Sequence, residues 1–153
     1  MWFECTYKPD LVYGSLLYLK DEQSLYYDPW QKSDFTVLFG AAYVGLDVQA
    51  ATGQVVQISG ANPQRTWSRY RLSLPKAMPG HLLFRAEGPL PLSGAAVNYA
   101  SDWRTFYDPE RSCICMGDPE FDAKDKCVEF CRGIAAVLRG TELTAIWAKI
   151  KFV

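Results

Sequence analysis

The sequence predicts an α+β fold: a mainly antiparallel β-sheet of about nine short strands, one helix in the C-terminal region packed on the sheet, and a final strand. Three observations support this class. Short apolar runs alternate with turn residues along most of the chain, a helix start is signalled at Asp118-Pro119, and the last residues alternate again. The 153 residues have the usual length of one domain, so we expect a single globular domain over residues 1–153.

The first third of the chain is typical of β-hairpins. Residues 11–19 are rich in Leu, Val and Tyr, and a polar break at 21–23 separates them from a second strand near 25–27. Asp28-Pro29 then favours a turn, because proline presets φ and aspartate bonds to nearby amides. A further strand is expected over 35–39.

The middle of the chain continues the strand pattern. Residues 44–48 alternate between apolar and small or polar side chains, and 55–58 form a second strand. Gly53 suits the positive-φ position of the loop between them. Another strand is expected over 70–74, and the Gly- and Pro-rich residues 87–94 are expected to form an irregular connection.

A later hairpin is centred on Asp108-Pro109, with strands near 103–107 and 112–116. The helix is expected directly after it. Asp118 can cap the helix and Pro119 suits its first position. Four apolar residues recur at helical spacing: Cys127, Cys131, Ile134 and Leu138. Arg139-Gly140 ends the helix, and alternation over 146–152 predicts the final strand.

The charge composition limits the classes of partner that the protein can attract. Sixteen basic and 17 acidic residues leave a formal net charge of -1, so no global field attracts a polyanion or an anionic membrane. Arg65, Arg69 and Arg71, interleaved with Trp67 and Tyr70, are better explained by a solvated strand face than by a nucleic-acid site. We therefore expect neither nucleic acid nor membrane as a partner.

The cysteines indicate a reducing compartment. The N-terminus lacks the pattern of a secretion signal, and no apolar run approaches the ~20 residues that span a bilayer. Five cysteines without such a signal are expected to be free thiols, so we expect a cytoplasmic protein. Four of them form the candidate metal ligands: Cys113, Cys115, Cys127 and Cys131. Their spacing lacks the close pairs typical of zinc sites, and buried thiols in an apolar core are the preferred interpretation, with no cofactor expected.

Catalytic patterns are weak. His81 is the only histidine, and nothing in the sequence aims a serine or cysteine at it. Phosphate-binding glycine loops are missing from the sequence. An alternative function remains open, namely a small-molecule-binding or hydrolytic domain with a cleft near residues 81–102, using His81, Glu87 or Asp102 as its polar groups.

Aromatic residues favour a binding function. They make up 14% of the chain, and several lie near turns or strand ends. Tyr and Trp combine a large apolar area with a polar tip, which suits protein interfaces. The expected partner-binding residues are Trp30, Trp67, Tyr70 and Trp103. The leading hypothesis is therefore a non-catalytic intracellular binding protein that recognises a protein partner; by size and class only, immunity and antitoxin-like proteins fit this description.

Overall fold

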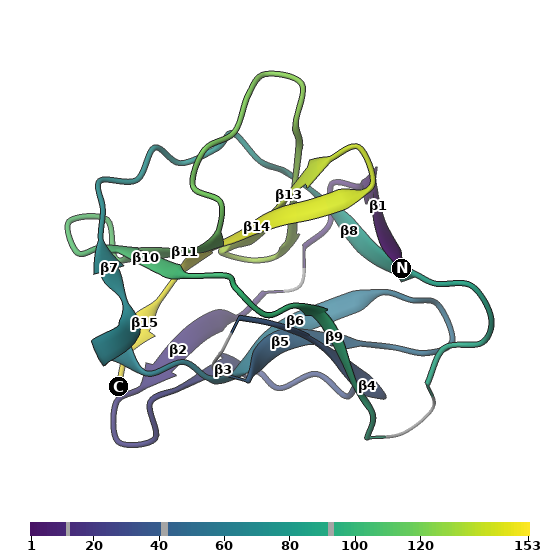
Figure 1. Cartoon of the computed structure of the whole chain (residues 1–153), viewed down its shortest axis with the longest axis horizontal. Helices are drawn as coiled ribbons and strands as arrows, with labels where there is room; N and C mark the ends of the chain where they lie inside the picture. The colour runs from purple at the N-terminus through teal and green to yellow at the C-terminus, as the bar shows by residue number, and fades with distance from the viewer. Residues whose placement is uncertain (12, 41–42, 92–93) are drawn as a thin grey trace.

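Two β-sheets lie one above the other in the computed structural model, which describes residues 1–11, 13–40, 43–91 and 94–153 (Figure 1). The described residues form fifteen strands and one short 3₁₀ turn, Gln64–Thr66. Both sheets are mixed, since each combines antiparallel neighbours with parallel pairs such as β12·β8 and β4·β9.

One sheet has eight strands. Their spatial order is β1 (Trp2–Tyr7), β8 (Met78–Arg85), β12 (Lys126–Cys131), β13 (Ile134–Arg139), β14 (Glu142–Lys149), β11 (Cys113–Gly117), β10 (Thr105–Asp108) and β7 (Ser68–Arg69). Strand β14 lies at the centre and pairs with β13 on one side and β11 on the other. The two halves of this sheet are therefore joined through β14.

The other sheet has seven strands. Their order is β15 (Lys151–Phe152), β2 (Ser15–Leu19), β3 (Ser24–Asp28), β6 (Val55–Ala61), β5 (Val44–Val48), β4 (Phe35–Phe39) and β9 (Ala96–Ala100). The chain passes from the centre of the first sheet to the edge of the second through Ile150, which is buried. The last strands thus tie the two layers together.

The main core lies between the sheets. It contains alternate residues of the facing strands, for example Val44, Leu46 and Val48 of β5, as expected for strands with one face buried. Buried aromatic residues cross the layers: the Tyr27 hydroxyl of β3 donates to the Arg132 carbonyl of the other sheet at 3.2 Å. One core cluster therefore includes residues of both sheets.

The predicted helix is wrong, and with it the α+β class: no α-helix occurs in the described residues. Residues 118–138 instead contain an irregular connection followed by the hairpin β12–β13. The helical spacing was misleading because Arg132-Gly133 forms a tight turn within it, with Gly133 at φ +83. Glycine reaches that φ without strain and weakens a helix interior, so Gly133 favours the hairpin.

Several predicted hairpins are confirmed. Strands β2 and β3 pair antiparallel, as do β5 and β6, whose loop contains Gly53 at φ +77. Strands β10 and β11 pair on either side of Asp108-Pro109. The strand predicted over 70–74 is wrong, because residues 70–77 form an irregular segment that Figure 1 shows running over the outside of the eight-stranded sheet.

The outer face of the eight-stranded sheet carries a second apolar cluster. Its buried members are Leu72, Cys113, Cys115, Val137, Ala145 and Trp147. Leu72 comes from the 70–77 segment, and its backbone N–H donates to the buried carboxylate of Asp108 at 3.1 Å. This contact fixes the segment on the sheet.

The outer face of the seven-stranded sheet carries a polar network instead. Asp47 is 3% exposed, and its carboxylate accepts hydrogen bonds from Thr36 Oγ1, Gln57 Nε2 and Ser59 Oγ. Gln57 also exchanges hydrogen bonds with the backbone of Gln31, which covers it. Every side chain in this network has a polar partner.

Candidate functional site

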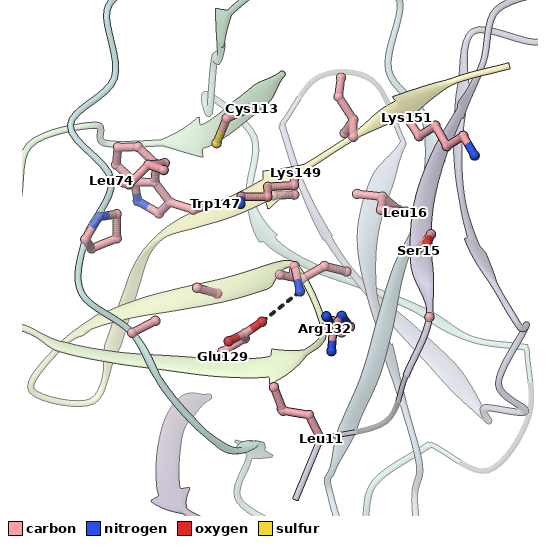
Figure 2. Close-up of a pocket in the computed structure, with 18 residues that line it drawn as sticks. Leu11, Ser15, Leu16, Leu74, Cys113, Glu129, Arg132, Trp147, Lys149 and Lys151 are labelled. Carbon is pink, nitrogen blue, oxygen red and sulfur yellow. Dashed lines mark hydrogen bonds between the residues drawn. The ribbon is translucent and has the colours of Figure 1, made fainter. Parts of the chain in front are cut away.

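A groove of about 710 Å³ is lined by residues of both sheets. Its walls come from the β12–β13 turn, the end of β14, the start of β2 and residues 74–77. Figure 2 shows Trp147 and Lys149 on one side and Glu129 and Arg132 on the other. We name this hollow the groove.

A row of paired residues explains the floor of the groove. Glu129 pairs with Ala135, and Ala135 pairs with Trp147 on the next strand. Side chains of paired residues point to the same face of a sheet, so the small Ala135 lies between two large neighbours. Because adjacent strands are ~4.8 Å apart, Glu129 and Trp147 stand roughly 10 Å apart across this floor.

The turn that carries Arg132 is held in place from two sides. Glu129 Oε2 accepts a hydrogen bond from the Gly133 backbone N–H at 2.8 Å, drawn as the dashed line in Figure 2. The Arg132 carbonyl accepts the bond from Tyr27 described above. The Arg132 guanidinium lies 4.9 Å from the centre of the Tyr13 ring, a cation–π distance. Arg132 is therefore positioned by a fixed backbone and a flanking aromatic ring.

Trp147 is the unusual residue of the groove. It is 3% exposed, and its indole Nε1–H has no hydrogen-bond partner in the described residues. In folded proteins the great majority of buried donors have a hydrogen-bond partner, because a donor that is buried without one has lost its bond to water. The Nε1 atom itself is buried, so a ligand in the groove does not reach it in this structure.

The charges of the groove are mostly positive. Arg132, Lys149 and Lys151 line it, and none of them forms an ion pair within the described part of the chain. Glu129 is its acidic residue, and one oxygen already accepts the Gly133 N–H. In Figure 2 the Lys149 amine extends toward Trp147, whereas the Lys151 amine turns away.

Cys113 also lines the groove but is a poor nucleophile. Burial raises the pKa of its thiol to about 11, so the thiol is protonated at neutral pH. No histidine lines the groove in the described residues. Cys113 therefore has no adjacent histidine base in the described lining of the groove.

The predicted partner-binding aromatics lie in different places. Trp30 is 48% exposed and stacks on Tyr26, and Tyr70 is 41% exposed. Trp67 is partly buried among core aromatics and donates its Nε1–H to Asn62 at 3.0 Å, and Trp103 packs on Phe39. None of the four lines the groove.

The four candidate metal ligands do not share one face. Cys113 and Cys115 belong to the outer cluster and Cys127 packs against it, whereas Cys131 lies in the inner core and donates to the Val56 carbonyl at 2.9 Å. The bulge between Glu129 and Cys131 reverses the alternation, so Cys127 and Cys131 face opposite ways. No group of three or more metal-ligating side chains comes together in the described ranges.

The segment 81–102 borders separate hollows. Glu87 lines one of about 410 Å³ beside Trp2, and Asp102 lines another of about 760 Å³. His81 lines neither of these two hollows. In the larger one, Arg139 pairs with Asp125 at 3.2 Å and Arg104 donates to Ser68, so its cations are already engaged.

Sequence reasoning missed the groove residues. The alternation of Trp147 and Lys149 with Ile146 and Ala148 was visible, and it placed Trp147 on the polar face of the last strand. A tryptophan among lysines on such a face was an available signal for a functional surface. The approach of Arg132 depends on a hairpin that was predicted as a helix.

The comparisons with known proteins give no assignment. No protein-family model matches the sequence, and no curated protein matches it.

The described residues contain no helix with the length and apolar character that a bilayer crossing requires.

Proposed function

We propose that this chain is a non-catalytic binding protein and that the groove holds a segment of its protein partner. The observation that carries the proposal is the groove itself: the small Ala135 leaves space on its floor, and the cations that line it form no ion pair in the described residues. A hollow with uncommitted charges on its walls is typical of a binding site.

A protein segment fits the groove better than a small substrate does. The groove is only partly enclosed, whereas small-molecule sites enclose most of their ligand. Two exposed apolar side chains extend the surface beside it, Leu74 at 40% and Tyr13 at 76% exposure. Large exposed apolar side chains next to a hollow are typical of protein-binding surfaces.

The cytoplasm is the proposed location. All five cysteines are free thiols, and free thiols persist in a reducing compartment. Burial raises the pKa of Cys127 to about 12, which further limits oxidation because the thiolate is the reactive form.

The test is an unbiased selection of ligands. A displayed library of random linear peptides is selected against the wild-type protein, and the enriched peptides are measured on the variant Ala135→Leu. The larger side chain fills the floor from the outer face, so the expected result is a loss of binding. Ala96→Leu, an exposed strand position on β9, is the matched control and is expected to bind normally. Enriched peptides that bind wild type and Ala135→Leu equally would refute the proposal.

A further inference from the structure

The cations of the groove lie at its accessible surface. Arg132, Lys149 and Lys151 line the groove and are exposed to solvent. None of the three forms an ion pair in the described residues, so their charges are neutralised by solvent ions alone. A partner in the groove can therefore reach these charges directly.

Two of the cations flank the turn between β12 and β13. The Lys149 backbone N–H donates to the Gly133 carbonyl at 2.9 Å, and the Lys149 Cβ lies 3.8 Å from the position that a Cβ on Gly133 would take. Arg132 directly precedes Gly133, so the Arg132 and Lys149 side chains start from neighbouring segments of the chain. The backbone of this turn holds both cations at the same groove.

The groove differs in charge from the rest of the chain. Its described lining has three cations and one carboxylate, Glu129, and so carries a net charge of +2, whereas the whole chain carries -1. The residues outside the groove together therefore carry -3. A long polyanion such as a nucleic acid would meet this opposing charge beyond the groove, whereas a short acidic segment meets the cations alone.

The cations also point in different directions. In Figure 2, Arg132 and Lys149 stand on different sides of the groove, and the Lys151 amine turns away from it. One compact anion is not placed to contact all three. A chain segment with several separate carboxylates can bring one near each cation, because its side chains are spaced along its backbone.

We propose that the groove binds an acidic segment of the partner protein, with several aspartate or glutamate side chains, through Arg132 and Lys149, and that Lys151 adds a supporting charge at the rim. This inference rests on the proposed function and names the chemistry of the partner. Leu74, which is 40% exposed in the wall of the groove, offers an apolar contact to residues between the acidic ones.

The experiment starts from the peptides that the selection above enriches and that lose binding to Ala135→Leu. These peptides are expected to contain more Asp and Glu than the unselected library. Replacing all their acidic residues by Asn or Gln should weaken binding roughly tenfold or more, measured by fluorescence anisotropy. Raising the salt concentration from about 50 to about 500 mM should weaken the acidic peptides but hardly affect their Asn and Gln counterparts.

Variants of the protein test the same contacts from the other side. Arg132→Glu and Lys149→Glu are each expected to weaken the acidic peptides roughly three- to tenfold, because an attraction between exposed charges becomes a repulsion. Lys20→Glu, at the opposite end of β2 from the groove, is the matched control: it changes the charge of the chain equally and is expected to leave affinity unchanged. Equal weakening by all three variants would show that only net charge matters and would overturn the inference.

The outcomes separate the two proposals. Peptides that depend on Ala135 but are not enriched in acidic residues, or that tolerate Asn and Gln in their place, would overturn the acidic-segment inference while the binding function stands. If no selected peptide distinguishes Ala135→Leu from wild type, the proposed function fails and the inference fails with it.

Two competing ligands are tested directly. A fluorescein-labelled oligo(dT) that binds as tightly as the acidic peptides and is weakened by Arg132→Glu would assign the cations to nucleic acid. Succinate that displaces the peptides with an affinity equal to theirs would assign them to a free organic acid. Either result would overturn the inference.

Discussion

The outer faces of the two sheets are covered in different ways. On the seven-stranded sheet, Asp47, Gln57 and the backbone of Gln31 form a network in which each polar group has a partner. On the eight-stranded sheet, Leu72 and Trp147 pack in an apolar cluster, and the Trp147 N–H is left without a partner in the described residues. One face is held by paired polar groups, and the other mainly by apolar packing.

This difference teaches where to look for function in a β-sandwich. A covered face whose hydrogen bonds are all made contributes stability and specificity. Removing one group there leaves its hydrogen-bond partner buried and unpaired. A covered face beside a hollow lined by uncommitted charges is a candidate binding surface. The comparison therefore separates the structural polar network around Asp47 from the candidate site beside Trp147.

The largest expected effect is on the apolar face. Leu72→Ala removes the side chain that anchors the 70–77 segment, and Leu72 is 1% exposed, so we expect a loss of roughly 3 kcal/mol in the free energy of unfolding. Urea denaturation measures it. Leu74→Ala in the same segment is the control and should cost only about 1 kcal/mol, since Leu74 is 40% exposed and buries less apolar surface. Equal losses would show that Leu72 is not the anchor.

The polar face should yield a smaller loss. Asp47→Ala leaves the donors of Thr36, Gln57 and Ser59 without their acceptor, and we expect about 2 kcal/mol of destabilisation by urea denaturation. Asp102→Ala, at an exposed position, is the control and should change stability by about 0.5 kcal/mol or less. An Asp47→Ala variant as stable as wild type would mean that the network contributes no net stability.

Alkaline pH should lower the stability of the protein through Cys113, on the apolar outer face of the eight-stranded sheet. The pKa of Cys113 is raised by burial to about 11, above the ~8.5 of an unfolded thiol, so its contribution to stability is complete below about pH 8.5. As pH rises from there toward 11, the unfolded state loses the proton first, and stability falls by about 1.4 kcal/mol per pH unit for this thiol. Urea midpoints measured from about pH 8 to about pH 11 test this. Cys113→Ala should show a shallower decline, and an unchanged slope would contradict the assignment.

The smallest expected difference is between two tryptophan variants. Trp147→Phe removes a donor that has no partner but also part of a buried ring, so it should cost about 1 kcal/mol of unfolding free energy from packing alone. Trp67→Phe is the matched control, because it also loses the Nε1–H bond to the buried Asn62 and should cost about 1 kcal/mol more. Comparable losses in both variants would show that the Trp147 N–H is paired within the folded chain.

Much of the strand pattern was predictable from the sequence, but the prediction was wrong where the same residues fit both the strand period of two and the helical period of 3.6. Ile134, Ala136 and Leu138 alternate as a strand, yet Ile134 and Leu138 also fit helical spacing with Cys127 and Cys131. The deciding residue was Gly133, whose positive φ closes the β12–β13 turn. The cost of Gly133 inside a helix outweighs the capping signal at Asp118.

The candidate site was less predictable than the strands because it is built from distant segments. Arg132, Trp147 and Leu74 come together only through the pairing of β13 with β14 and the crossing of the 70–77 segment. Local patterns carry no information about which strands become neighbours, particularly in mixed sheets with parallel pairs. The partner-binding aromatics were predicted one residue at a time from the local sequence. The burial of Trp67 and Trp103, in contrast, depends on which strands become neighbours.

The central place of β14 has a consequence for biosynthesis. Without β14, the pairing order leaves β1, β8, β12 and β13 on one side and β11, β10 and β7 on the other, with no bond between the two groups. Residues 142–149 emerge from the ribosome after every other strand of both sheets except β15. A nascent chain that ends before Glu142 therefore presents two unjoined sheet fragments with open edges, which are the surfaces that chaperones bind and that aggregate.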